Sequence, residues 1–264
     1  MINLRDKGAS IWENWSPPAR SSFVLIVITL AALLPFAGDF GPTSFLNTPI
    51  SSYQAVLVYP IALFVLMGLG LNIVVGKSGL LDLGYVAFFA IGAYTMGIMG
   101  TMTKLNTWEI LPFGIFFAMI AGLLLGLPAL RLRGDYLAIV TLGFGEIVRI
   151  IALNLEVTGG PNGVVGVPTP PPILGQKFEL DDHKAYFWVI LIMILLVIWM
   201  VRRFTVRRPG RAWEAIRQDE DVAALMGVNL LVYKLWSFTI GAAVGGAGGV
   251  IYASKTMFIA PDMF

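Results

Sequence analysis

The sequence predicts an all-α membrane protein, a polytopic helix bundle with about seven transmembrane helices. Of the 264 residues, 57% are hydrophobic and 13% are charged, whereas a soluble domain usually carries about 25% charged residues. The mean hydropathy is +0.80, and apolar stretches long enough to cross a bilayer recur along the chain. Lysine and arginine gather in alternate connecting segments, as the positive-inside rule requires. These three observations favour a membrane bundle over a globular domain.

Seven apolar stretches predict the membrane crossings. We expect them at 21–37, 54–76, 80–101, 108–127, 136–155, 185–201 and 231–253. The first stretch follows a polar, mildly basic segment, as in a secretory signal, but its apolar run is longer than usual and no small-residue cleavage site follows. We therefore interpret it as a retained helix.

The distribution of positive charge predicts the orientation. With residues 1–20 in the cytoplasm, thirteen lysines and arginines fall in cytoplasmic segments and four in external ones. Removing the fifth crossing would place the sequence RRFTVRRPGR outside the membrane, against this rule. The predicted arrangement is one membrane domain over 1–264, with a cytoplasmic N-terminus, an external loop at 156–184 and a charged cytoplasmic segment at 202–229.

The stretch GLNIVVGKSG (70–79) looks like a phosphate-binding loop, but its spacing excludes that function. The phosphate-binding pattern needs four residues between its glycines and joins a strand to a helix. Here five residues separate Gly70 from Gly76, and an uncharged apolar run precedes them. The stretch is interpreted as the polar end of a membrane helix.

Composition also excludes several kinds of chemistry. There is no cysteine, so the sequence offers no disulfide and no thiolate site. The one histidine, His183, stands in the polar sequence DDHK, and we expect a solvated loop residue there. No catalytic constellation and no metal site is predicted within the spans. The net charge of +2 indicates no nucleic-acid partner.

The cytoplasmic segment predicts one amphipathic helix. After the Pro209-Gly210 break, a helix is expected from Arg211 to Met226, with Gly227 as its C-terminal cap. The apolar residues that fall near one face are Trp213, Ile216, Ala223 and Met226. The opposite side is mixed in sign, unlike the basic face of most lipid-surface helices. A docking surface for a soluble partner therefore fits the segment better than a membrane-surface helix.

Charges inside the predicted spans mark candidate residues for a transport path, because a charge in the bilayer is costly. Glu146 and Arg149 are three residues apart, so they can pair on one helical face. They are either a structural pair or contacts for the ammonium and carboxylate of a zwitterionic substrate. Gly143 and Gly145 could loosen that helix and expose backbone groups. Asp82 is expected to cap or orient the third span.

Small residues recur at helical spacing in two rows. One row is Gly241, Gly245 and Gly249, and the other is Ala118, Gly122 and Gly126. Such rows allow helix backbones to approach closely in lipid. Tight packing is the simpler interpretation; a substrate path or a contact with a partner permease is the alternative.

Three stretches resemble the permeases of branched-chain amino acid ABC importers, of the M type. These stretches are GLGLNIVVGKSGLLDLGYVAFFAIGAY (68–94), LRLRGDYLAIVTLGFGEIVRIIALNLEVTGGPNGVVGVP (130–168) and WEAIRQDEDVAALMGVNLLVYKLWSFTIGAAVGGAGGVIYA (213–253). The resemblance covers nearly everything from Tyr53 to Phe264. Related permeases for urea, ribose or purine nucleosides share the architecture.

The resemblance implies a non-catalytic, pore-forming subunit of an ATP-driven importer in a bacterial or archaeal plasma membrane. It implies that the segment after the sixth span docks on the ATPase, and the residues assigned to this coupling are Glu214, Ala215, Arg217, Asp219 and Gly227. The residues assigned to the transport path are Glu146, Arg149, Gly143, Gly145, Asn72 and Asp82.

The implied partners are ABC ATPase subunits, a second homologous permease, a solute-binding protein and the lipid bilayer. No cofactor is expected on this chain, because ATP and magnesium would bind to the ATPase subunits. The family normally continues beyond the seventh span with further membrane helices. The chain is therefore expected to be truncated at its C-terminus.

The sequence is also compatible with two other transport functions. The same kind of permease could carry urea or another small polar solute. A self-contained secondary transporter could relay protons through Glu146 or Asp82, although the charged segment at 202–229 would then have no evident purpose.

Overall fold

The computed structural model describes residues 17–39, 53–103, 105–129, 132, 134–172, 178 and 183–264. The chain divides into two compact units, Met1–Gln54 and Ala55–Phe264. The described part of the first unit contains helix α2 (Pro17–Leu33) and the 3₁₀ turn η1 (Leu34–Asp39). The first expected crossing is therefore helical.

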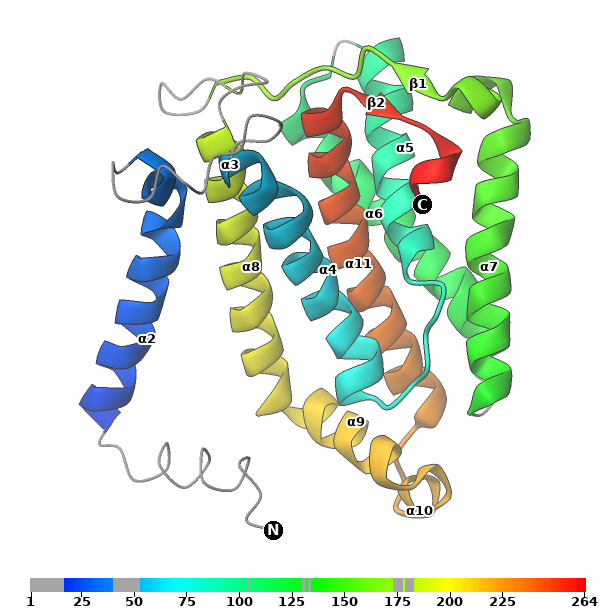
Figure 1. Ribbon diagram of the computed structural model, residues 1–264. Helices are drawn as coiled ribbons and strands as arrows, with labels where there is room; N and C mark the ends of the chain where they lie inside the picture. The colour runs from blue at the N-terminus through cyan, green and yellow to red at the C-terminus, as the bar shows by residue number, and fades with distance from the viewer. Residues whose placement is uncertain are drawn as a thin grey trace. The chain divides into compact units, whose positions relative to one another are not determined.

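The second unit is a bundle of helices that run between its two ends (Figure 1). Its first helical run consists of α3 (Tyr53–Val56), the π-helix η3 (Leu57–Ala62), α4 (Leu63–Leu71) and the π-helix η4 (Asn72–Lys77). The run is kinked inside η3, where Tyr59 has a non-helical backbone (φ −136°, ψ 121°). The other long helices are α5 (Val86–Met102), α6 (Thr107–Ala129), α7 (Asp135–Asn154), α8 (His183–Thr205) and α11 (Leu230–Thr256). Two short helices, α9 (Arg208–Gln218) and α10 (Glu220–Leu225), join α8 to α11.

All seven apolar stretches contain the expected helices. Among the described residues, five helical runs are long and apolar enough to cross a membrane: Tyr53–Lys77, Thr107–Pro128, Asp135–Asn154, His183–Thr205 and Leu230–Thr256. The apolar helices Ser22–Phe36 and Val86–Met102 are shorter. The helix of the fifth crossing forms despite its two charges.

Helix α11 lies at the centre of the second unit because its small residues admit its neighbours. A Cβ at Gly249 would overlap the carbonyl oxygen of Phe89 in α5, and one at Gly122 would lie 2.8 Å from Cβ of Ala242. The two small-residue rows therefore serve close helix packing, the simpler of the two interpretations.

The third crossing differs from its prediction at its start. Residues 78–85 are not helical, and α5 begins only at Val86. In Figure 1 this segment rises from the end of η4 along the bundle before α5 begins. Neighbouring helices stabilise the segment through one backbone and one side-chain group: the Leu83 amide donates to Oγ1 of Thr141, and the Tyr85 hydroxyl donates to the carbonyl of Gly241. Non-helical backbone at membrane depth is stable only when it is covered in this way.

The described part of the segment between α7 and α8 contains short elements of regular structure. After the 3₁₀ turns η5 (Glu156–Thr158) and η6 (Gly160–Asn162), strand β1 (Val164–Val165) pairs antiparallel with β2 (Phe258–Ile259). A further 3₁₀ turn, η7 (Pro261–Met263), follows β2. The all-α prediction thus misses one small sheet. His183 begins α8, so the expectation of a loop residue there is wrong.

Candidate functional site

A cavity of about 440 Å³ lies between α5, α7 and the C-terminal residues of the chain. Its lining is mainly apolar and includes Leu83, Val86, Leu142 and Phe264. The charged residues Glu146 and Arg149 of α7 also line it. An apolar pocket with a few convergent polar groups is the usual form of a small-molecule site.

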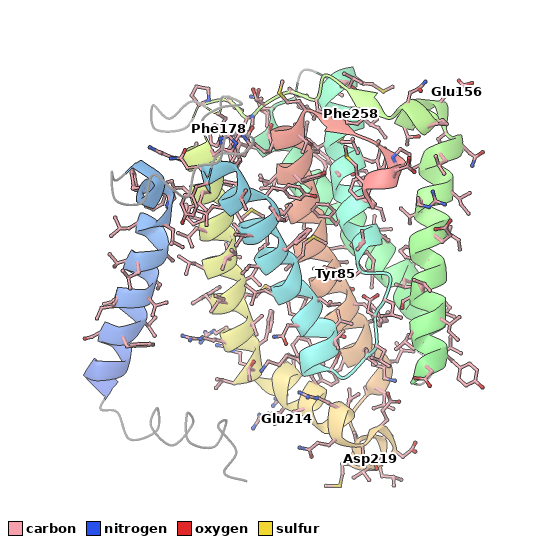
Figure 2. All side chains as sticks on the ribbon, viewed as in Figure 1. Tyr85, Glu156, Phe178, Glu214, Asp219 and Phe258 are labelled. Atoms are coloured by element: carbon pink, nitrogen blue, oxygen red, sulfur yellow. The ribbon has the colours of Figure 1, made fainter. Side chains whose placement is uncertain are left out.

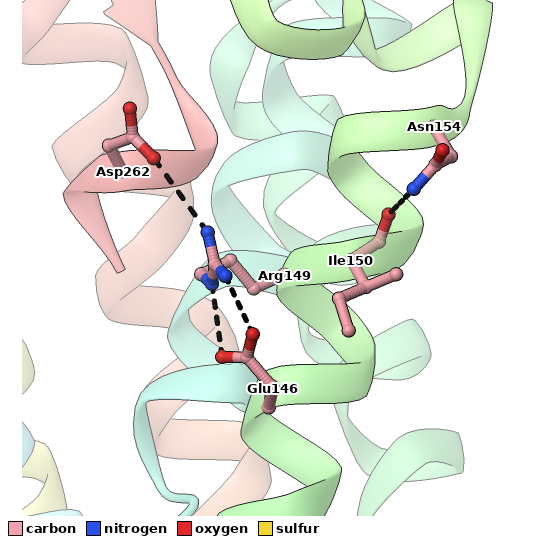
Figure 3. Close-up of polar contacts among 5 residues, drawn as sticks. All are labelled: Glu146, Arg149, Ile150, Asn154 and Asp262. Carbon is pink, nitrogen blue, oxygen red and sulfur yellow. Dashed lines mark hydrogen bonds and ion pairs between the residues drawn. The ribbon is translucent and has the colours of Figure 1, made fainter.

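Glu146 and Arg149 form a two-pronged ion pair in this cavity (Figure 3). Nε of Arg149 lies 3.0 Å from Oε2 of Glu146, and the terminal guanidinium nitrogen lies 2.6 Å from Oε1. A second carboxylate, Asp262 of η7, approaches the guanidinium at 3.8 Å. The pairing predicted from the spacing is confirmed. The Arg149 guanidinium therefore pairs closely with the carboxylate of Glu146 and more weakly with that of Asp262.

The cavity also contains a polar group that sequence reasoning missed. Tyr94 of α5 lines it and is only 7% exposed, and its hydroxyl has no hydrogen-bond partner among the described residues. A buried hydroxyl without a partner is unfavourable by about 1–3 kcal/mol. It is therefore available to a polar ligand. Nothing in the sequence distinguishes Tyr94 from a packing aromatic residue.

Three of the six residues expected on a transport path line this cavity. Gly145 joins the charged pair in the cavity lining, and Gly143, Asp82 and Asn72 do not. Helix α7 continues without a break through both glycines, so the predicted loosening is wrong. A Cβ at Gly145 would lie 3.6 Å from Cα of Gly84, which is an ordinary contact distance, so the structure has room for a small side chain there.

Asp82 lies in the non-helical segment before α5 and is buried. Its Oδ1 accepts a hydrogen bond of 3.0 Å from the amide of Gly84, two residues before α5 begins at Val86. Its Oδ2 has no hydrogen-bond partner within the described ranges. The expected orienting role fits the Gly84 contact, although it acts on the turn before α5 and not inside a helix.

At one end of the unit, the segment between α8 and α11 forms two helices and not the single helix predicted. The break is at Asp219, whose backbone is extended at φ −160° and ψ 115°. Its Oδ1 accepts hydrogen bonds from the amides of Asp221 and Val222, so Asp219 caps α10. Gly227 ends α10 as predicted, with φ +83°. The amides of Gly227 and Val228 donate to the carbonyls of Ala224 and Ala223, as at many helix ends.

The break changes which side chains are buried. Trp213, Ile216 and Ala223 are buried as the predicted face requires, but Met226 is 80% exposed, because α10 has turned away from the axis of α9. Val222 and Leu225 are exposed beside it. Figure 2 shows Glu214 and Asp219 at this end of the unit, opposite Glu156 and Phe258. The exposed groups form a surface that could receive another protein.

Helix α9 is attached to the spans by its side chains. The Trp213 indole donates to the carbonyl of Tyr233 at 2.7 Å, and Arg217 donates to the carbonyl of Gly76 at 2.6 Å. The close approach of Gly79 to Arg217 extends this contact, since a Cβ at Gly79 would lie 2.9 Å from Cγ of Arg217. Arg217 therefore connects α9 to the start of the non-helical segment that leads to α5.

A buried ion pair attaches α10 to α11. Nζ of Lys234 lies 2.6 Å from Oε1 of Glu220, and only 3% of the lysine side chain is exposed. From the sequence, Lys234 is only one of the cytoplasmic charges, and Glu220 is not among the predicted site residues. The two residues belong to separate helices, with a break at residues 226–229 between them, so only the fold could bring them together.

Comparison with known proteins identifies relatives over most of the chain. The family model described as the branched-chain amino acid transport system permease component matches residues 55–264. The permease LivM of the high-affinity branched-chain amino acid transport system is 38% identical in Escherichia coli (strain K12) and 42% identical in Salmonella typhimurium. Each alignment covers 92% of this chain and 59% of the relative.

A more distant relative is the probable branched-chain amino acid transport permease LivM of Methanocaldococcus jannaschii. It is 28% identical over 75% of this chain and 61% of its own length. The chain thus spans about three fifths of the length of these curated relatives. No solved structure matches.

Proposed function

Because the chain belongs to the branched-chain amino acid transport permease family, we propose that it forms part of the membrane pathway of an ATP-driven importer of branched-chain amino acids. The observation that carries the proposal is the α9–α10 segment. It presents exposed side chains at one end of the bundle and is attached to two spans by Arg217 and Lys234. A partner that moves this segment would therefore move the spans as well.

The proposed partner at this surface is an ABC ATPase. Glu214, Asp219 and Gly227 are exposed there, next to the apolar side chains of Val222 and Leu225. Docking would bury these apolar groups, and the ATP and magnesium would be held by the ATPase subunits. The chain itself would act as a non-catalytic transport subunit, together with a second permease and a solute-binding protein.

The cavity between α5 and α7 is the proposed contribution of this chain to the path. A zwitterionic amino acid offers a carboxylate to Arg149 and an ammonium group to Glu146, while its aliphatic side chain suits the apolar lining. Ionisable residues inside a span commonly mark such pathways. In this arrangement the N-terminus and the α9–α10 segment lie on the cytoplasmic side.

Uptake of radiolabelled leucine in cells tests the proposal. Deletion of the chain's gene is expected to abolish high-affinity uptake, and a plasmid copy is expected to restore it. A second strain carries the partner ATPase with its catalytic glutamate replaced. Leucine uptake that persists in this second strain would contradict ATP-driven transport and favour a self-contained secondary transporter.

A further inference from the structure

Five arginines gather where α8 turns into α9. They are Arg202, Arg203, Arg207, Arg208 and Arg211, and all are exposed. Within the part of the chain that the structure describes, no ion pair joins any of these guanidinium groups to a carboxylate. This arginine cluster therefore presents uncompensated positive charge, which the transport function of the chain does not use.

Two hollows shape the surface of the cluster. One, of about 310 Å³, is lined by Trp199, Arg202, Arg203, Val206 and Arg207. The other, of about 490 Å³, is lined by Phe204, Pro209 and the arginines 207, 208 and 211. Arg207 borders both, because the chain changes direction there between the two helices. The planar guanidinium fork binds phosphate oxygens better than a single point charge does.

The position of the cluster indicates where such a phosphate would come from. Arg202 and Arg203 occupy the last turn of α8, a 23-residue apolar helix. Trp199 is 66% exposed one turn before them, and Val206 is 83% exposed beside them. Tryptophan prefers the boundary between lipid and water. A phospholipid would place its headgroup among the arginines and its acyl chains along α8, whereas a free phosphate would use none of the apolar surface.

We propose that the arginine cluster is a binding site for the headgroup of an anionic phospholipid. This site is separate from the transport path and does not depend on the identity of the transported solute. Clusters of basic residues next to the end of a membrane helix commonly attract anionic lipid. The positive-inside rule alone explains the sign of the charge, but not the convergence of the arginines around two hollows with exposed apolar walls.

Native mass spectrometry of the full chain in detergent tests the proposal, with titration of phosphatidylglycerol and of phosphatidylcholine. The chain is expected to bind phosphatidylglycerol in preference. Each cationic side chain near a membrane contributes about fivefold to such binding, so Arg203→Gln/Arg207→Gln should weaken it on the order of 25-fold. The matched control is Arg131→Gln/Arg133→Gln, which removes the same charge from another predicted cytoplasmic segment and should leave the affinity nearly unchanged.

Four outcomes would overturn the proposal. Equal loss in both double variants would mean that only net charge matters, and equal binding of the two lipids would mean that there is no anionic site. Competition by glycerol phosphate at the same concentration as the lipid would indicate a free-phosphate site.

The fourth outcome comes from a separate assay, co-purification with the ATPase. Loss of ATPase co-purification in Arg203→Gln/Arg207→Gln, with unchanged lipid binding, would assign the cluster to a protein interface. Thermal unfolding of each variant checks that it remains folded.

Discussion

Nζ of Lys234 in α11 lies 2.6 Å from Oε1 of Glu220 in α10, and the lysine side chain is almost completely buried. Removing Glu220 leaves a buried ammonium group without this partner, whereas removing Lys234 leaves a carboxylate that is 21% exposed and can reach water. We therefore expect Glu220→Gln to lower the free energy of unfolding by about 3 kcal/mol, near the lower end for buried pairs. Lys234→Met is expected to cost less.

Thermal unfolding of the purified chain in detergent measures this difference. The double variant Lys234→Met/Glu220→Gln should be about as stable as Lys234→Met alone, since no charge is then left unpaired. Two equal single losses that add in the double variant would contradict a coupled pair.

Arg217 is expected to transmit movement from α9 to the third crossing. Its guanidinium donates to the carbonyl of Gly76 at 2.6 Å, just before the non-helical segment. A hydrogen bond to a charged group contributes about 1.5–3 kcal/mol, so Arg217→Ala should reduce ATP-driven uptake about tenfold or more. Co-purification with the ATPase should persist. The control is Gln218→Ala, an exposed neighbour on the same helix; a similar loss of uptake in both variants would argue against a specific role for Arg217.

Asp219 should determine the shape of the docking surface. Its carboxylate caps α10 through two backbone amides, and replacing such a cap by alanine costs about 1 kcal/mol. Asp219→Ala is expected to weaken ATPase co-purification. Asp219→Asn should retain it, because asparagine caps helices nearly as well. If both variants bind the ATPase equally poorly, the charge of Asp219 matters more than its capping role.

Gly84 and Gly143 provide a matched pair of glycine substitutions. A Cβ at Gly84 would overlap the carbonyl oxygen of Thr141, whereas a Cβ at Gly143 would have no atom within 4 Å. Gly84→Ala is therefore expected to displace the non-helical segment and to lower the melting temperature. Gly143→Ala should be neutral or stabilising by up to about 1 kcal/mol, since alanine favours a helix. Equal melting temperatures for the two variants would refute the close approach at Gly84.

Variants of the ion pair in the cavity can distinguish its role in folding from a role in transport. Arg149→Gln leaves the charge of Glu146 without this partner, and Glu146→Gln leaves Arg149 with only the 3.8 Å contact to Asp262. Each single variant should therefore lower the yield of folded protein more than the double variant does. If the pair also contacts substrate, the double variant should fold well and still transport leucine poorly. Yield by size-exclusion chromatography and uptake by radiolabel are measured on the same preparations. Full uptake by a well-folded double variant would remove both residues from the transport path.

The coarse architecture could be predicted because the bilayer constrains it strongly. A crossing needs about 20 apolar residues in a helix, so the pattern alone located seven helices, including α7 with its two charges. The pairing of Glu146 with Arg149 followed from helical periodicity in the same way. The left-handed cap at Gly227 followed from the conformational freedom of glycine. These features are local, and local sequence was sufficient for them.

The sequence by itself therefore determined the crossings, the pair on α7 and the end of α10. Only the tertiary structure decided that residues 78–85 are not helical, that Lys234 joins Glu220, and that Tyr94 faces the cavity. The non-helical segment is stable because Thr141 and Gly241, far away in the chain, accept hydrogen bonds from its polar groups. Such contacts depend on which helices pack together, and hydropathy and spacing along one chain do not contain that information.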